Sequence, residues 1–172
     1  VEDNLYDKLS ARYTRALARS MSNTKQVKAA SVLNNAFSSS YPGGDAVSLI
    51  NSAHPTAMGG NWSNTLATQA DLNETSLEQA LIDISLFIDE RGLKIAQRGI
   101  KLIVPPQLQF TSERLLKSEQ RVGTADNDIN AIKSGSYLPG GFTVNHFLTD
   151  PDAWFVKTDA PNGLKHFVRS PL

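Results

Sequence analysis

The sequence contains no cysteine among its 172 residues. Disulfide bonds, thiolate nucleophiles and cysteine-ligated zinc are therefore excluded, and stability has to come from packing or from a link of another kind. The sequence also lacks an apolar run near the roughly 20 residues that would cross a bilayer. No charged leader with an apolar core opens it, so nothing in it predicts secretion.

Net charge is absent as well, because 17 lysine and arginine residues balance 17 aspartate and glutamate residues. A neutral total gives no electrostatic footprint for nucleic acid, and it protects a protein poorly from self-association. The apolar fraction of 40% is enough for a sizeable core in one domain or two closely joined lobes. These totals suit an assembling subunit, although many monomers are also neutral.

A long helix is predicted over residues 2–37. Leu5, Leu9, Tyr13 and Leu17 recur at helical spacing, and the apolar pattern then thins. At 1.5 Å per residue this helix would be roughly 50 Å long, too long for a compact domain of this size to cover. The sequence therefore predicts an extended or plate-shaped molecule. Both ends of the chain are expected to be cut from something longer.

The rest of the chain is predicted to form loops and then an α+β body. Residues 38–71 are turn-rich, with one short strand at 46–50. A helix at 76–91 follows, with a capping box made by Thr75 and Glu78 and with Gly92 as its C-cap. Periodicity and turn residues predict the later elements: a strand at 100–104, a helix at 106–118, a helical turn at 127–132, and strands at 142–148, 153–157 and 164–169. This order indicates α+β rather than a βαβ repeat.

Histidines are few and form no recognisable catalytic or metal-binding motif. His54, His146 and His166 match neither a helical zinc motif nor a glycine-flanked serine elbow. The last two fall in predicted strands, where packing or surface exposure is the simpler interpretation. His54 precedes Pro55 in a loop, so a structural kink is favoured, and a small hydrolase that uses His54 is a weaker alternative.

Carboxylates are plentiful, but the sequence does not place them in a site. We expect most of them on solvated surface: Asp83, Asp89, Glu90, Asp126, Asp128, Asp150 and Asp152. The segment 126–128 resembles half of a calcium loop but lacks the required glycine and terminal glutamate. The sequence therefore predicts no catalytic, cofactor-binding or metal-ligating residue, and no enzyme.

The two tryptophans receive different predictions. Trp154 lies in an apolar strand pattern and is expected in the core. Trp62 lies in a polar loop, where an exposed aromatic ring could anchor a neighbouring subunit. Local packing within the loop is the alternative for Trp62. It is the single residue for which we predict a subunit contact.

Several blocks together resemble the major capsid protein of tailed bacteriophages, especially the Mu-like head-subunit type. They cover most of the chain in order: residues 13–20, 34–37, 50–55, the loop at Asn61, 77–80, 103–106 and 148–154. The resemblance implies a fold with a peripheral domain on a long spine helix and an axial domain. It assigns residues 1–75 to the spine helix and the extended loops, and 76–172 to the body.

The same resemblance implies a function without chemistry or cofactors. Copies of the chain would form hexamers and pentamers of an icosahedral head in the virion, around DNA that is not read by sequence. Scaffolding, portal and decoration proteins would be further partners, and assembly would occur in the host cytoplasm. An encapsulin-like compartment shell with the same fold is the alternative. No lysine here matches the crosslinking site of some relatives.

Overall fold

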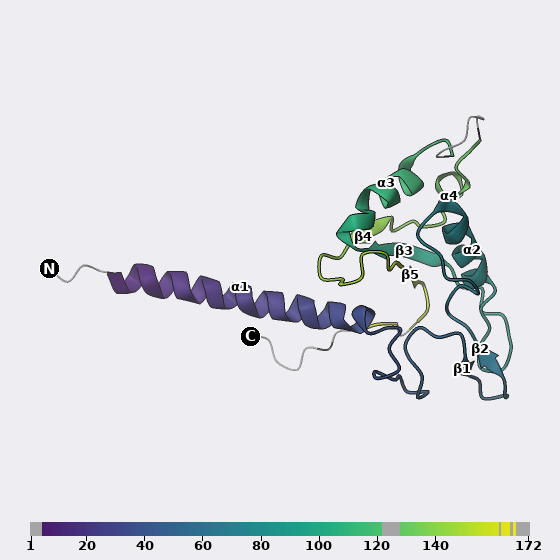
Figure 1. Cartoon of the computed structure of the whole chain (residues 1–172), viewed down its shortest axis with the longest axis horizontal. Helices are drawn as coiled ribbons and strands as arrows, with labels where there is room; N and C mark the ends of the chain where they lie inside the picture. Colours follow the sequence, from purple (N-terminus) through teal and green to yellow (C-terminus); the bar gives the residue numbers. More distant parts are fainter. Residues whose placement is uncertain (1–4, 122–127, 162, 166, 168–172) are drawn as a thin grey trace.

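The computed structural model describes residues 5–121, 128–161, 163–165 and 167. Figure 1 shows a single long helix, α1, projecting from a body that holds the other elements. The helix α1 spans Leu5–Asn34, 30 residues, or about 45 Å at 1.5 Å per residue. The predicted helix over residues 2–37 is thereby confirmed within its described part, apart from its last three residues.

Most of α1 is in contact with solvent alone. Every residue from 9 to 29 is exposed, and the first buried one is Ala30. The hydroxyl groups of Thr14 and Thr24 donate to carbonyls one turn earlier, at 2.8 and 2.9 Å. These bonds satisfy both hydroxyl groups within the helix itself, so the two polar side chains need no partner elsewhere.

The end of α1 is fixed to the body by specific bonds. The Asn34 amide donates to the Phe147 carbonyl at 3.0 Å and accepts from the Thr149 N–H at 3.1 Å. The Ile50 N–H donates to the carbonyl of Ala36, which is buried, at 2.8 Å. Three distant segments therefore meet at this joint and set the direction in which α1 leaves the body.

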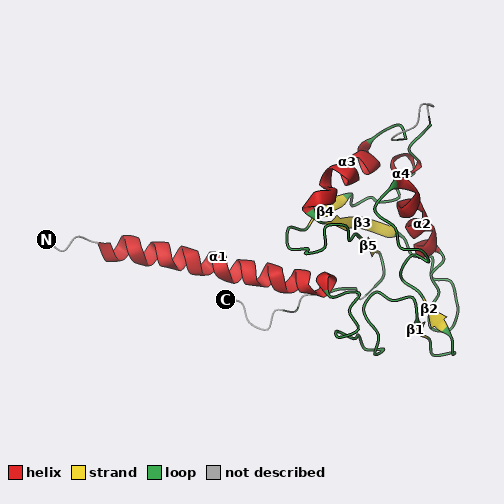
Figure 2. Ribbon diagram, viewed as in Figure 1, coloured by secondary structure: helices red, strands yellow, loops and turns green. Residues whose placement is uncertain are grey.

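A three-stranded sheet forms the centre of the body (Figure 2). The middle strand β3, Gly99–Val104, pairs in parallel with β4, Phe142–Val144, and antiparallel with β5, Phe155–Thr158. The β3 sequence is a nearly continuous apolar run, as expected for a strand covered on both faces. The predicted strand at 100–104 is confirmed.

Three short helical segments pack around this sheet and complete the core. They are α2, Glu74–Ser85, a 3₁₀ turn at Pro106–Leu108 that continues into α3, Gln109–Lys117, and α4, Ala131–Ser134. The buried apolar side chains come from all of these regions: Leu72, Leu77, Leu102, Val104, Leu115, Ile132 and Leu138. The predicted helix at 106–118 is confirmed, and so is the packing of Trp154 against the core.

The prediction for the helix at 76–91 is wrong at both ends. Asn73, not Thr75, is the N-cap, and its capping box uses Ser76. The helix ends at Ser85, after which Asp89 organises a turn by accepting from the Arg91 and Leu93 N–H groups, both at 2.8 Å. Gly92, with φ of 81°, belongs to that turn rather than to a helix cap. A turn stabilised by the Asp89 carboxylate thus ends the helix within a sequence pattern that still looks helical.

The predicted strand at residues 46–50 is also wrong. Ala46 has φ of 66°, and the Gly43 N–H donates to the Val47 carbonyl at 2.6 Å, so the chain folds back on itself. A single antiparallel bridge joins Pro42 to Ser48. The apolar pattern is present in the sequence, but the turn at Ala46 limits the backbone pairing of this segment to that one bridge.

The later strands are shorter than predicted. β4 ends at Val144, so His146 lies in an exposed turn rather than in a strand. β5 begins at Phe155, two residues after the predicted start. α4 begins at Ala131, four residues after the start of the helical turn predicted at 127–132. Of the predicted strand at 164–169, the described residues form no strand, and His166 lies outside them. Asp126 and Asn127 also lie outside the described residues.

Candidate functional site: an aromatic and acidic groove

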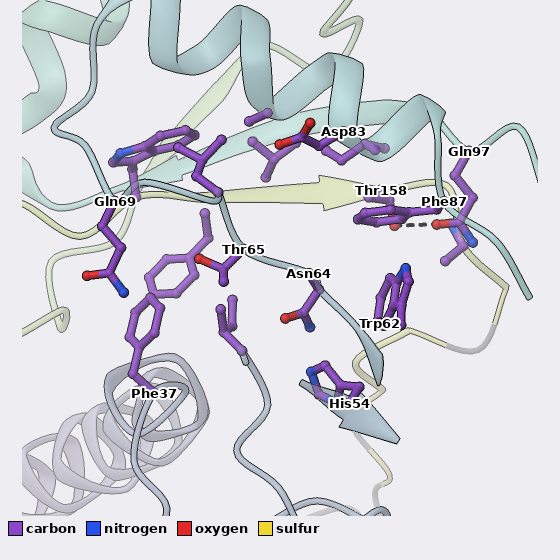
Figure 3. Close-up of a pocket in the computed structure, with 18 of the residues that line it drawn as sticks. Phe37, His54, Trp62, Asn64, Thr65, Gln69, Asp83, Phe87, Gln97 and Thr158 are labelled. Carbon is purple, nitrogen blue, oxygen red and sulfur yellow. Dashed lines mark hydrogen bonds between the residues drawn. The ribbon is translucent and has the colours of Figure 1, made fainter. Parts of the chain in front are cut away.

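The loop that carries Trp62 folds as a small hairpin. β1, His54–Pro55, pairs antiparallel with β2, Asn61–Trp62, and this register sets His54 opposite Trp62. Their ring centroids lie 5.5 Å apart, and the ring of Phe87 meets the indole edge-on at 4.9 Å. Figure 3 shows Trp62 held between His54 and Phe87. Trp62 is half-buried in this stack, so local packing accounts for part of its surface.

Asparagine side chains hold this irregular segment in place. The side-chain oxygen of Asn64 accepts from the Asn51 N–H, and its side-chain amide nitrogen donates to the Leu49 carbonyl, both at 2.8 Å. The Ala53 N–H donates to the side-chain oxygen of Asn51 at 2.9 Å. These bonds replace the ladder that a sheet would provide. They explain how a long stretch with little regular structure adopts one conformation.

His54 is paired with a carboxylate on the preceding loop. Its Nδ1 lies 2.6 Å from Oδ2 of Asp45, and the side chains are 13% and 35% exposed, respectively. This hydrogen bond from His54 is the main cause that lowers the pKa of Asp45, against a smaller opposing effect of burial. The pair ties residues 43–48 to the hairpin beneath Trp62.

The second ring nitrogen of His54 faces no catalytic partner among the described residues. Nε2 is buried and has no hydrogen-bond partner among the described residues. In a hydrolase this atom would contact a nucleophile and be reachable by substrate. The Asp45–His54 pair therefore supplies two members of a triad without the third, and the geometry favours a structural role. The hydrolase alternative gains no support from it.

A wide groove opens beside the stack. Its cavity has a volume of about 1270 Å³ and runs between the β1–β2 hairpin, α2, the turn after α2 and β5. Aromatic and aliphatic side chains from these segments form its walls, among them Phe37, Trp62, Phe87, Ile95 and Trp154. Figure 3 shows Phe37, at the end of the α1 segment, facing the same space from the other side. The groove therefore begins where α1 leaves the body.

The charge of this groove has one sign. Seven carboxylates line it and no lysine or arginine does: Asp45, Asp71, Asp83, Asp89, Glu90, Asp150 and Asp152. Asp83 and Asp89 are half-buried, and the other five are exposed. No group of three or more potential ligands among the described residues could hold a metal ion. The carboxylates are thus spread along a surface rather than gathered around a point.

Sequence reasoning missed this groove, although it named five of the seven carboxylates one by one as surface residues. They come from four separate segments, and the folding of the loops brings them together. A signal was nevertheless available, because residues 8–44 contain no aspartate or glutamate at all. Because residues 8–44 contain none of them, fourteen of the seventeen acidic residues lie from Asp45 onward.

The molecule thus combines an exposed helix, a small α+β body and a groove lined by aromatic and acidic side chains. Among the described residues, no helix combines the length and apolar character needed to cross a membrane. A family model described as "Phage capsid protein" matches residues 1–171, and the chain belongs to this family of bacteriophage structural proteins of the virion. No curated protein and no solved structure matches it. The family match confirms the resemblance to phage capsid proteins, and the observed α+β fold agrees with it.

Proposed function

We propose that this chain is a subunit of a major capsid protein that assembles into hexamers and pentamers of an icosahedral phage head around the packaged DNA genome. The observation that carries the proposal is the match to the phage capsid family over residues 1–171. The function would consist of repeated contact between copies rather than of chemistry. Neither His54 nor any carboxylate is assigned a catalytic role.

The exposed surface of α1 supports a function in association. Tyr6, Tyr13 and Leu17 are 83%, 68% and 61% exposed, and they share one side of the helix. Large apolar side chains that gather on one exposed face are typical of interaction sites. A helix without tertiary contacts along most of its length is therefore suited to binding another chain.

The proposed architecture assigns α1 to the spine helix of a peripheral domain, with residues 1–75 as one part and 76–172 as the axial body and adjoining strands. The joint at Asn34 and the start of α2 at Glu74 are compatible with this division. The Mu-like subtype, the scaffolding, portal and decoration partners, and assembly in the host cytoplasm belong to the same proposal.

Trp62 is proposed as a subunit-contact residue on the wall of the groove. Its ring is already supported by His54 and Phe87. An aromatic ring fixed in this way loses little conformational entropy when a partner covers it, as is common for anchor residues at interfaces. Trp62→Ala would reduce assembly more than His146→Ala, an exposed control in a turn away from the groove.

The test is the particle mass of the protein expressed from its complete gene, measured by light scattering and checked by negative-stain imaging. Rings of five or six copies, or closed shells, are expected. A protein that stays monomeric under all assembly conditions would overturn the proposal. The surroundings of His54 would then become the next place to look for function.

A further inference from the structure

The basic residues at the start of the chain are separated from the acidic ones. Residues 8–44 contain six lysines and arginines and no carboxylate, whereas the remainder holds eleven basic and all seventeen acidic residues. Arg12, Arg15 and Arg19 lie within α1, are exposed, and form no ion pair in the described part of the chain. Within the described residues, no ion pair therefore neutralises these three arginines.

The charged and apolar side chains of α1 occupy neighbouring faces. Arg12, Arg15 and Arg19 follow one another at intervals of three and four residues and so lie along one side. Leu9, Tyr13 and Leu17 follow one another at intervals of four residues and lie along the adjacent side. The helix therefore presents an apolar stripe bordered by a basic stripe, and both are uncovered.

The groove is complementary to this surface in chemistry. It offers seven carboxylates beside walls of aromatic and aliphatic side chains. Aromatic rings on its wall, Trp62 and Phe87 among them, can contact an apolar stripe, and the carboxylates can pair with arginines.

The helix cannot fill the groove of its own molecule. α1 leaves the body at the Asn34 joint and points away from it (Figure 1), and Phe37 already lies on the groove wall. A rigid helix cannot fold back across three residues to reach that wall. An α1 that occupies the groove therefore has to come from another copy.

We propose that α1 of one copy docks in the acidic groove of the next, with the apolar stripe on Trp62 and Phe87 and the arginines against the carboxylates. This contact joins two different surfaces, so it is heterologous, and repetition gives a ring where the rotation closes. The inference rests on the proposed shell function and identifies the surfaces that would join neighbours in a capsomer.

Duplex DNA is the competing partner for the arginines. Phosphates would neutralise Arg12, Arg15 and Arg19 but would leave Tyr13 and Leu17 in water. DNA would also leave the acidic, aromatic groove without an occupant. The combined apolar and charged match therefore favours a second copy of this chain.

Charge reversal on each surface tests the docking. In the complete protein, the helix variant R12E/R15E/R19E and the groove variant D71K/E90K/D152K change residues that are exposed, so both should fold. Each is expected to weaken self-association about tenfold or more at ~0.15 M salt, measured by sedimentation velocity. The control K94E/R114E/K157E reverses three exposed basic residues of the body and should associate like the parent.

Mixing the two variants gives the decisive result. The glutamates of the helix variant can pair with the three lysines of the groove variant, and the unchanged helix of the groove variant matches the unchanged groove of the helix variant, so an equimolar mixture should associate more strongly than either variant alone. Helix-variant assembly at parental strength would overturn the docking while leaving the shell function standing. Loss of duplex DNA binding without loss of self-association would overturn it in favour of DNA. A monomeric parent would instead refute the proposed function itself.

Discussion

The helix α1 and the body of this protein follow opposite rules. The body buries its apolar side chains around β3, with Leu77, Leu102 and Val104 fully covered. The helix leaves Tyr6, Tyr13 and Leu17 in water and is joined to the body at one end. The comparison teaches that the same kinds of side chain can serve folding in one region and association in another. Burial within the monomer therefore separates the residues that hold the fold from those available to a partner.

The largest difference between the two regions should appear when a charge is placed on an apolar position. Leu77→Asp would bury an unpaired carboxylate in the core and should cost about 4 kcal/mol or more, enough to unfold the body. Leu17→Asp, on the exposed helix, should leave the melting temperature of the body nearly unchanged. Circular dichroism during thermal unfolding measures both, and equal losses in the two variants would erase the distinction.

A buried polar residue gives the next largest effect. Asn130 is 3% exposed, donates to the Leu115 and Ser118 carbonyls at 2.7 and 3.1 Å, and accepts from the Ile132 and Lys133 N–H groups at the start of α4. Asn130→Ala should destabilise the body by about 2–3 kcal/mol, since it removes a cap and leaves a buried carbonyl unpaired. Urea denaturation tests this value, and a loss below that of an exposed asparagine such as Asn61 would contradict the network.

The joint between the regions should respond in geometry more than in stability. Asn34→Ala removes two bonds to residues 147 and 149 and should cost about 1 kcal/mol. It should also broaden the distance distribution between spin labels on α1 and on the body, which can be attached cleanly because the chain has no cysteine. Asn35→Ala is the matched control, since the Asn35 amide donates within its own segment to Ser31. Equal broadening in both variants would show that Asn34 does not orient the helix.

The smallest expected effect concerns pH at the hairpin. The folded-state pKa of Asp45 is below its usual value of 3.8, so its bond to His54 stabilises the protein above that pH. The contribution is lost as the pH falls through the lowered pKa, because protonation removes the charge that attracts the imidazole N–H. Asp45→Asn should therefore lower the melting temperature at pH 6 and make no difference at strongly acidic pH. A difference that persists at low pH would assign the effect to something other than this carboxylate.

The sequence predicted those elements whose local signals agree with their tertiary surroundings. The α1 periodicity, the apolar run of β3 and the proline that opens the 3₁₀ turn before α3 each specify a structure without reference to distant residues. The packing of Trp154 against the core was also predicted correctly, although Trp154 lies just before β5 rather than within it. The long, thinly apolar helix correctly indicated an extended molecule.

Elements were missed where side chains act across the chain. The capping box moved to Asn73 and Ser76, since an asparagine can cap as well as a threonine can. The end of α2 depends on Asp89 and on the contact between Phe87 and Trp62, which no local pattern reveals. The acidic groove depends on four segments that meet only in the folded molecule. The sequence shows which acidic residues are present, but it does not show that they come together in the fold.

The most direct test of the account compares the complete protein with its Tyr13→Asp/Leu17→Asp variant. Both residues are exposed in the monomer, so the variant should fold and melt like the parent. Light scattering should then find rings or shells for the parent and folded monomers for the variant. A variant that assembles as well as the parent would contradict the claim that α1 serves association rather than folding.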